Sequence, residues 1–390
     1  MANGELMVVA GEASGDLHAA DVLAELRRRR PGLRAFGMGG PRLEAAGLER
    51  LFDAREISVM GIAEVLPRLP RIWRVFRALV RAARERHPAA ALLVDVPDFN
   101  LRLARKLRRL GVPVVFYVSP TVWAWRRGRV RQIARDVDRM LCILPFEEEF
   151  YRTHGVRARY VGNPVVEQLP PPGAPEAFRR ALGLEAGRPT LALLPGSRRS
   201  ELQRLLPPMV ESAALLAKDR PELQIVVPVA PGLERAPVEE AFAARGLHPT
   251  LVDGRAPEVV GASDVVVVAS GTATLETALM LRPMVVVYRM SALSWAVGRL
   301  LVRVAFVSLV NLLSGRRLVP ELLQSALRPE AVAAEVRRLW APGAERDAQL
   351  EGLRALRGRL GEGPVASRVA DEVLEVLDAR AKDAGPSTPR

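Results

Sequence analysis

Cysteine is nearly absent from the sequence, with a single residue, Cys142, among 390. No internal disulfide can therefore form, and the apolar stretch RMLCILP around it favours a buried thiol over a nucleophile. Histidine is also scarce, and the four histidines lie far apart without the spacing of metal ligands. No nucleophile-elbow pattern occurs. The sequence thus predicts a reducing compartment, no metal site, no cofactor and no covalent hydrolase chemistry.

Lysine is scarce as well, because only three of the 57 basic residues are lysines and 54 are arginines. The formal net charge of +13 is of the kind found in proteins that bind nucleic acids or anionic membranes. However, the arginines are scattered along the chain, and there is neither a basic low-complexity tail nor a zinc-finger spacing. We therefore expect no nucleic-acid partner.

Long uninterrupted apolar runs are missing too. The first residues, MANGELMVVAGEASGD, have no basic region before a long apolar stretch, so they read as a first strand and not as a signal peptide. The longest later apolar region, 291–313, is interrupted by Arg299 and Arg303, whereas crossing a bilayer takes about 20 apolar residues. The sequence predicts a cytoplasmic protein without a transmembrane helix.

What the chain does have is a regular alternation of strand-like and helix-like segments, which favours parallel sheets made of βαβ units. The proline-rich stretch LPPPGAPEAF, from position 169, interrupts this alternation as a stiff connection would. We predict an α/β fold with two doubly wound, Rossmann-like domains, 1–168 and 169–345, that face each other across a cleft. Helices and a polar tail follow at 346–390, and we expect them to pack back on the first domain or on a partner subunit.

Two loops of the second domain have the composition of an anion site. LLPGSRRSE places Gly196, Ser197 and Arg198 between a strand and a helix, where glycine permits a tight turn and the other two offer donors. An ordinary turn with a capping serine would look the same. VVVVASGTATLE places a second small-residue loop at a helix start, which suits a diphosphate. Its candidate residues are Ser270, Gly271 and Thr272. Glu276 follows one turn later and could bind sugar hydroxyls, or it could simply be an exposed residue of the helix.

Acidic and small residues gather at two strand ends of the first domain. The stretches VVAGEASGD and VDVPDFN both follow apolar strands, and the carboxyl ends of parallel strands are where open α/β sheets bind ligands. The candidate residues are Glu12, Ser14, Gly15, Asp16, Asp95 and Asp98. Asp16 and Asp98 have a simpler explanation as helix caps, and Asp95 as a turn residue.

A basic amphipathic stretch, LPRLPRIWRVFRALVRAARERHP, combines Trp73 and Phe76 with five arginines between 71 and 84. This pattern is typical of helices at membrane interfaces, although a helix that packs on the first sheet would also have it. VSPTVWAWRRGRVRQI adds Trp123 beside further arginines. An amphipathic, anionic substrate would suit both stretches.

Taken in order, the stretches VVAGEASGD, VMGIAEVL, VDVPDFN, YVSPTVWAWR, LPFEEEFY, LLPGSRRSE, ASGTATLETAL and SLVNLLSGRRLVPELLQ make the chain similar to the bacterial lipid-A-disaccharide synthase family, from about residue 5 to 341. That resemblance implies the two-domain GT-B glycosyltransferase fold. It also implies the joining of UDP-2,3-diacylglucosamine to 2,3-diacylglucosamine 1-phosphate, with release of UDP and a β-1,6-linked disaccharide phosphate as product.

The resemblance also implies residue roles. Asp95 would be the general base, with Asp98 or Glu12 orienting it. The diphosphate would lie on Arg198 and the loop 270–272, and the ribose on Glu276. Further donor-binding positions would be Asn311 and Gln324, and the acceptor lipid would lie near Ser14, Gly15, Asp16, Met60, Trp73 and Trp123.

Beyond the active site, the resemblance implies a homodimer and peripheral attachment to the cytoplasmic face of the inner membrane. One departure is Asn163 in YVGNP, where the family usually has histidine. Two other functions stay open at this point. One is a metal-free UDP-sugar epimerase of the same architecture, and the other is a non-catalytic basic protein that binds membranes or nucleic acid.

Overall fold

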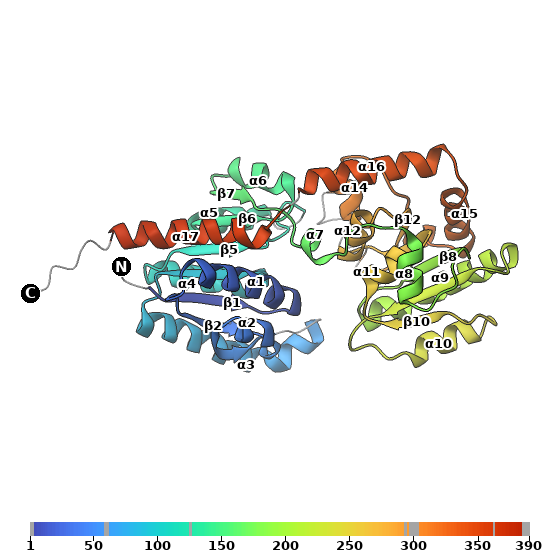
Figure 1. The fold of residues 1–390 in the computed structure, drawn as a ribbon. Coiled ribbons are helices and arrows are strands. Elements are labelled where there is room, and N and C mark those ends of the chain that lie inside the picture. Colours follow the sequence, from blue (N-terminus) through green and yellow to red (C-terminus); the bar gives the residue numbers. More distant parts are fainter. Residues whose placement is uncertain are drawn as a thin grey trace, which may run out of the picture. The chain divides into compact units, whose positions relative to one another are not determined.

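The structure is a computed structural model that describes residues 4–57, 62–124, 127–291, 295, 304–361 and 363–383. The chain forms two compact units (Figure 1). Unit 1 comprises 1–164 and 363–390, and unit 2 comprises 165–362. The chain thus passes from unit 1 to unit 2 shortly before the predicted boundary at 168/169. Of the C-terminal segment 346–390, the part up to 362 belongs to unit 2, and the part from 363 belongs to unit 1.

Unit 1 contains a seven-stranded parallel sheet in the order β3-β2-β1-β4-β5-β6-β7. Its strands are β1 Leu6–Ala10, β2 Ala35–Gly39, β3 Leu48–Asp53, β4 Ala90–Val94, β5 Val114–Tyr117, β6 Arg139–Cys142 and β7 Ala158–Tyr160. The helices are α1 Ala13–Arg29, α2 Pro41–Ala45, α3 Ile62–Arg86, α4 Pro97–Arg109, α5 Val130–Asp136, α6 Pro145–Arg152 and α17 Val365–Asp383, with 3-10 turns η1 Ala54–Glu56 and η2 Arg127–Arg129.

Unit 2 contains a six-stranded parallel sheet in the order β10-β9-β8-β11-β12-β13. Its strands are β8 Thr190–Leu194, β9 Gln224–Val229, β10 Thr250–Asp253, β11 Val265–Ala269, β12 Met284–Tyr288 and β13 Glu321–Leu323. The helices are α7 Val165–Gln168, α8 Pro175–Ala181, α9 Arg199–Asp219, α10 Ala236–Ala243, α11 Ala256–Ala262, α12 Thr272–Leu279, α14 Leu309–Ser314, α15 Pro329–Trp340 and α16 Ala344–Leu360, with the 3-10 turn η3 Gln324–Ala326.

Both sheets have the doubly wound topology that the alternation predicted. The central strands β1, β4, β8 and β11 are buried along their whole length, which explains why each reads as an unbroken apolar run. The strand order reverses between β1 and β4 in unit 1 and between β8 and β11 in unit 2. Ligands of open α/β sheets bind outside the carboxyl ends of strands at such reversals. The fold class is therefore confirmed, and it marks one candidate site in each unit.

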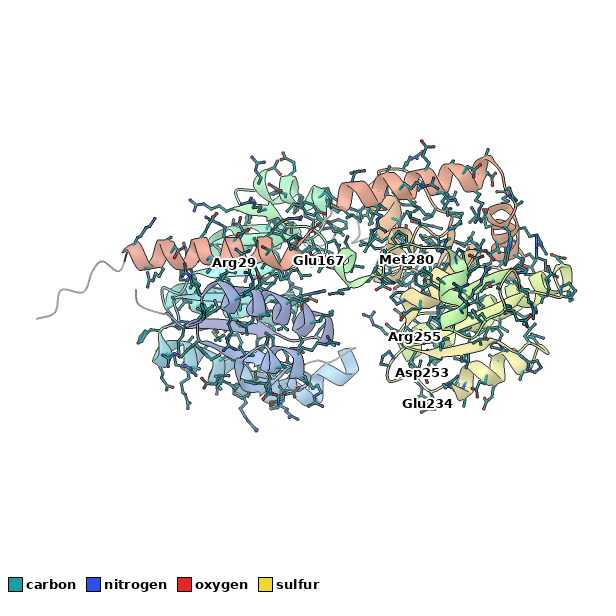
Figure 2. All side chains as sticks on the ribbon, viewed as in Figure 1. Arg29, Glu167, Glu234, Asp253, Arg255 and Met280 are labelled. Atoms are coloured by element: carbon teal, nitrogen blue, oxygen red, sulfur yellow. The ribbon has the colours of Figure 1, made fainter. Side chains whose placement is uncertain are left out.

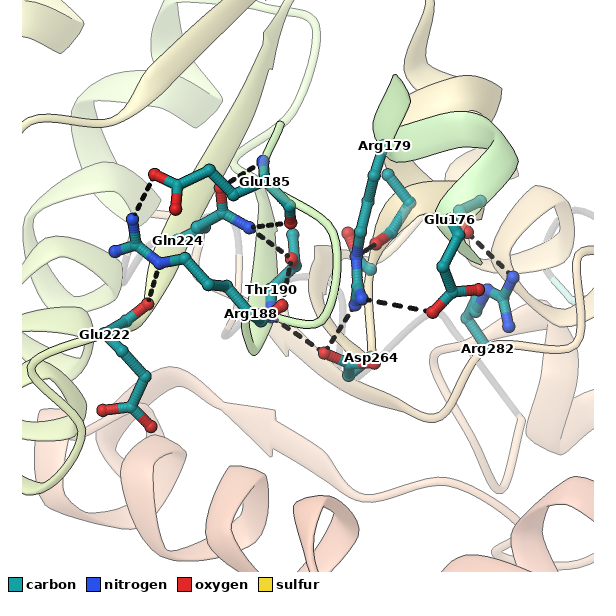
Figure 3. Close-up of polar contacts among 12 residues, drawn as sticks. Glu176, Arg179, Glu185, Arg188, Thr190, Glu222, Gln224, Asp264 and Arg282 are labelled. Atoms are coloured by element: carbon teal, nitrogen blue, oxygen red, sulfur yellow. Dashed lines mark hydrogen bonds and ion pairs between the residues drawn. The ribbon is translucent and has the colours of Figure 1, made fainter. Parts of the chain in front are cut away.

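The proline-rich connection is fastened to unit 2 by two arginines. Arg282 donates to the carbonyls of Gly173 (2.7 Å) and Gly261 (2.8 Å). Arg179, which is 3% exposed, donates to Ala262 O at 3.0 Å and to the carboxylate of Asp264 at 2.8 Å. Figure 3 shows these side chains converging below α8. The stretch thus belongs to unit 2 instead of acting as a free linker.

The last helix, α17, packs against α1 within unit 1 (Figure 1). Val369, Ala370 and Val373 are fully buried there, and Arg29 of α1 pairs with Asp371 at 2.5 Å. Arg29 is labelled beside this helix in Figure 2. The C-terminal end of the chain thus completes the unit that its N-terminal end begins. No helix among the described residues is long and apolar enough to cross a membrane.

Candidate active site

In unit 2, the loops at the carboxyl edge of the sheet enclose a cavity of about 610 Å³. The loop after β8 supplies Gly196, Ser197 and Arg198 to its lining, and the loop after β11 supplies 270–272. Glu276 of α12 and Tyr288 at the end of β12 complete this side. Two loops and one helical acid that are distant in the sequence are therefore brought together, because their strands end at one sheet edge.

The loop after β8 is shaped by Glu201, a residue that the sequence reasoning missed. Its carboxylate accepts the N–H of Ser197 at 3.1 Å and lies 3.5 Å from the guanidinium of Arg198. Gly196 has a φ of 109°, and a Cβ there would lie 2.4 Å from Glu201 Oε2. Only glycine fits this approach. Because the Arg198 side chain remains 59% exposed, it presents a positive charge to the cavity.

The loop after β11 ends at the first turn of α12. Gly271 precedes the helix, and no heavy atom lies within 4 Å of the place where its Cβ would be. Gly271 and Thr272 are exposed, so the unpaired amides of the helix start face open space. Ser270 donates its hydroxyl to Val307 O at 3.1 Å, which ties the loop to the segment before α14. The arrangement suits an anionic oxygen.

Glu276 is half-buried at the cavity wall, and this burial raises the pKa of its carboxyl. A carboxylate at such a place is a good acceptor for ligand hydroxyls. Arg255, in the loop between β10 and α11, lines the opposite part of the cavity and is labelled in Figure 2. Its φ is 49°, and it pairs with Glu258 at 3.3 Å. The sequence reasoning missed Arg255, because only the preceding glycine marks its loop.

Asn311 and Gln324, two expected donor ligands, do not line this cavity. Asn311 is fully buried, and its amide contacts the backbone of Leu318 and Val319 and the carboxylate of Glu321, all within 3.0 Å. Gln324 pairs through its amide with both backbone groups of Met290 at 3.2 Å. The polar atoms of Asn311 thus have partners inside the fold, between α14 and the segment that leads into β13.

In unit 1, Asp95 directly follows β4 at the strand-order reversal. Asp95 and Val96 have φ values of 54° and 43°, in the left-handed region that favours glycine. The backbone is held by Asp95 N–H to Tyr117 O at 3.0 Å and by the Asn100 amide to Asp95 O at 2.7 Å. Burial raises the pKa of the Asp95 carboxyl, against an opposing hydrogen bond from the Val96 N–H. The turn therefore holds in a fixed place a carboxyl whose pKa burial raises.

The loop after β1 touches this turn. A Cβ on Gly11 would lie 2.8 Å from a methyl carbon of Val96, so the two loops are in direct contact. Glu12 and Ser14 are exposed next to them, whereas Gly15 is buried beside Val94. The loop after β1 thus lies against the Asp95 turn, with Glu12 and Ser14 exposed on it.

Asp16 is a correction to the expected acceptor site. It is 4% exposed, and its carboxylate accepts the N–H groups of Gly40 (2.6 Å), Arg42 (3.1 Å) and Leu43 (3.2 Å). These are the first amides of α2, so Asp16 caps that helix from α1. Its role is to join two elements of the fold.

A second cavity, of about 730 Å³, lies beside the Asp95 turn. Its walls are mostly apolar, and its polar rim contains Glu12, Asp98, Arg102 and Arg129. Asp98 pairs with Arg129, so the structure gives this carboxylate a partner other than Asp95. Trp73 of α3 lines the cavity and is 52% exposed. The cavity therefore combines apolar surface with charges of both signs.

The other expected lipid residues have different outcomes. Met60 lies outside the described residues. Trp123 is only 8% exposed and donates its indole N–H to Glu147 at 2.9 Å, so it belongs to the interior and does not offer a surface for acyl chains. Asn163 is 2% exposed and donates to Ile143 O at 3.2 Å. No cluster of potential metal ligands occurs among the described residues.

The sequence model of the lipid-A-disaccharide synthetase family matches residues 6–357. A lipid-A-disaccharide synthase from Myxococcus xanthus is 64% identical over 372 residues, which cover 95% of this chain and 97% of that relative. The chain belongs to this family. A synthase from Geobacter sulfurreducens is 42% identical with the same coverage. The resemblance seen in the sequence is confirmed: the protein is a UDP-sugar glycosyltransferase of lipid A biosynthesis.

Solved structures agree on the fold. A UDP-GlcNAc 2-epimerase from Neisseria meningitidis bound to UDP-GlcNAc has a TM-score of 0.64 at 13% identity, covering 96% of this chain and 100% of that one. A calicheamicin glycosyltransferase has a TM-score of 0.62 at 17% identity, with 100% of both chains covered. These likenesses show the GT-B fold, which glycosyltransferases share with epimerases.

Proposed function

We propose that the protein transfers the sugar of UDP-2,3-diacylglucosamine to 2,3-diacylglucosamine 1-phosphate with inversion, giving the β-1,6-linked disaccharide 1-phosphate and UDP. The observation that supports this most is the 610 Å³ cavity, in which two anion-binding loops and one hydroxyl-binding acid meet in a chain of this family. The Neisseria epimerase of the same fold is bound to UDP-GlcNAc, which supports a UDP-sugar as donor.

Unit 2 holds the donor in this proposal. The diphosphate lies on the Arg198 guanidinium and on the amides of Gly271 and Thr272, while Glu276 accepts the ribose hydroxyls. As the bond between the anomeric carbon and the phosphate oxygen breaks, negative charge grows on the departing UDP. A fixed guanidinium and a helix start stabilise that charge without reorganisation.

Unit 1 supplies the base. The primary hydroxyl of the acceptor attacks the anomeric carbon, and its proton passes to the Asp95 carboxylate as the new bond forms. A positioned base of this kind contributes about 10² to 10⁴ in rate, most when its pKa approaches the working pH. The burial that raises the pKa of Asp95 supports this role. Asp98 or Glu12 would orient the Asp95 carboxylate, and Asp98 also pairs with Arg129.

The acyl chains enter through the 730 Å³ cavity and its exposed rim in this proposal. Trp73 (52%) and Leu69 (38%) are the large apolar side chains most open to solvent among the described residues, and the Arg77 guanidinium lies 5.9 Å from the Trp73 ring. An aromatic residue among arginines suits the boundary of an anionic bilayer. We therefore place α3 at the cytoplasmic face of the inner membrane, and we retain the homodimer as an expectation from the family.

The test is to incubate the purified protein with the acylated UDP-sugar, with and without the acylated sugar phosphate, and to follow UDP and disaccharide. The proposal expects UDP release that depends on the acceptor and equals disaccharide formation. Epimerisation of the donor without acceptor would instead indicate an epimerase. Absence of turnover together with salt-dependent vesicle binding would indicate the non-catalytic alternative.

A further inference from the structure

The motif LPFEEEFY has no part in the proposed mechanism, yet it contains the most deeply buried acid beside the unit 1 site. Glu147, in the first turn of α6, is 1% exposed. Its carboxylate accepts Ser119 Oγ at 2.6 Å, Trp123 Nε1 at 2.9 Å and Leu144 N–H at 3.1 Å. Within the described residues all these donors are neutral. A buried charge that has no counter-ion among the described residues is costly, which calls for an explanation beyond packing.

Two of the three donors belong to one loop. Ser119 and Trp123 lie in residues 118–124, which follow β5 and which we call the Trp123 loop. α6 holds this loop at two further points, because Tyr151 donates its hydroxyl to Pro120 O at 2.7 Å and Phe146 packs edge-on against the Trp123 ring at 4.8 Å. Capping of α6 alone would need only the Leu144 contact. Glu147 therefore fixes the loop as well as its own helix.

The Trp123 loop begins directly after Tyr117, the residue that holds the turn at Asp95. Tyr117 is the last residue of β5, and its carbonyl accepts the Asp95 N–H at 3.0 Å. The next residue, Val118, has a φ of 65°, so three non-glycine residues in the left-handed region meet here: Asp95, Val96 and Val118. For a β-branched residue this conformation is strained and persists only where surrounding contacts enforce it. The hydrogen bond from Ser119 Oγ to Glu147 holds the residue that directly follows Val118.

We propose that Glu147 is a positioning residue for sugar transfer, which holds the Trp123 loop and, through Tyr117 and the strained Val118, the backbone of Asp95. This inference rests on the proposed function, in which Asp95 is the base. Glu147 touches neither substrate nor the reacting atoms in this assignment.

The ionised form of Glu147 performs this task. A carboxylate can accept all three hydrogen bonds, whereas protonation turns one acceptor site into a donor and weakens them. Burial raises the pKa of Glu147 to about 7. The titratable groups that face it are Cys142 of β6, Tyr151 of α6 and Tyr160 of β7, and burial raises the pKa of all three, that of Tyr160 to about 12. Near neutral pH, therefore, only Glu147 in this cluster changes its charge.

The experiment compares Glu147→Gln with Glu149→Gln, an exposed acid on the same helix, in the acceptor-dependent transfer assay. We expect kcat at pH 8 to fall by about tenfold or more in Glu147→Gln. This is less than the full contribution of a positioned base, because Asp95 is still present but is held less firmly. UDP affinity should stay unchanged, because the donor cavity lies in unit 2. The inflection of kcat near pH 7 that Glu147 causes should also disappear, since glutamine resembles the protonated residue, and only the acid limb set by protonation of Asp95 should remain. Glu149→Gln should behave as the wild type.

Trp123→Phe and Ser119→Ala keep the inference testable if Glu147→Gln does not fold. Each removes one donor from the loop, so each should lower kcat with UDP affinity intact. The tryptophan fluorescence of the wild type should change near pH 7, and Trp123→Phe should abolish that change. Wild-type kcat in the folded variants, or a pH profile of Glu147→Gln that keeps the inflection near pH 7, would overturn the inference. If the wild type itself transfers no sugar, the proposed function fails instead.

Discussion

The carboxyl edges of the two sheets carry different kinds of site. The edge of unit 2 is built from glycines, hydroxyls and a helix start around an open cavity of about 610 Å³, with Arg198 reaching into it. The edge of unit 1 is built from a buried acid, Glu147, and a turn of left-handed residues around Asp95. A leaving diphosphate needs charge and exposed amides, whereas an attacking hydroxyl needs a base in one defined place.

The difference teaches where rigidity is needed. In unit 2 the loop after β8 combines the hydrogen bond to Glu201 with Gly196, which adopts a positive φ without strain, and Arg255 is the one non-glycine residue with a positive φ among the residues that line this cavity. In unit 1 the same kind of backbone is adopted by Asp95, Val96 and Val118, and hydrogen bonds from neighbouring elements hold it. Substitutions in unit 1 should therefore lower turnover without changing nucleotide affinity, and substitutions in unit 2 should weaken nucleotide binding.

The largest effect is expected for Asp95→Asn. The amide retains the size of the side chain but cannot take the proton, so kcat should fall by about 10² to 10⁴. The affinity for UDP, measured by calorimetry, should equal that of the wild type. The matched control is Asp21→Asn, which changes an exposed acid of α1. Unchanged turnover would remove Asp95 from the base role.

The next effect concerns stability and pH. Burial in the folded state raises the pKa of Glu147 from the ordinary value of 4.5 to about 7. Between these pH values the folded state binds more protons than the unfolded state, so the unfolding free energy falls as the pH rises. The wild type should therefore lose about 3 kcal/mol relative to Glu147→Gln across this window. Urea unfolding at intervals from pH 4 to about 8 measures this difference, and parallel curves for the two proteins would contradict it.

Arg198→Ala should weaken nucleotide binding. A hydrogen bond to a charged group contributes about 1.5 to 3 kcal/mol, which corresponds to about 10- to 100-fold in the Kd of UDP. Arg199→Ala, an exposed neighbour that does not line the cavity, provides the control. If the two variants bind UDP equally well, the diphosphate does not lie on the β8 loop.

The smallest effect is expected for Trp73→Ser in α3. Loss of one partly exposed aromatic side chain should lower binding to vesicles by about fivefold, or about 1 kcal/mol. Sedimentation with anionic and with zwitterionic vesicles should show the loss on both, because the arginines of α3 remain. If Trp73→Ser binds vesicles as strongly as the wild type does, the membrane contact lies elsewhere in the protein.

Sequence reasoning succeeded where position along a strand decides position in space. The loops 196–198 and 270–272 share one cavity because β8 and β11 are neighbours whose ends meet at the same edge. The contact between the loops after β1 and β4 follows from the same rule. Periodicity and turn residues therefore predicted the fold class and the position of both edges.

Sequence reasoning failed where a role depends on what packs against the residue. Trp123 looked like an exposed anchor beside arginines, yet Glu147 and Phe146 from α6 cover it. Asp16 looked like part of a ligand loop, yet it caps α2, 24 residues further on. Glu201 and Glu147 were missed because an acid in the first turn of a helix is common, and nothing local shows which loop it holds.

The position of α17 has a consequence for biosynthesis. The N-terminal unit needs Val369, Ala370 and Val373 to cover α1, and these residues are translated after the whole of unit 2. Unit 2 is translated completely before that, so the second half of the gene can finish folding before the first. A nascent or truncated chain that ends near residue 362 would expose the apolar face of α1, a surface on which chaperones or proteases can act.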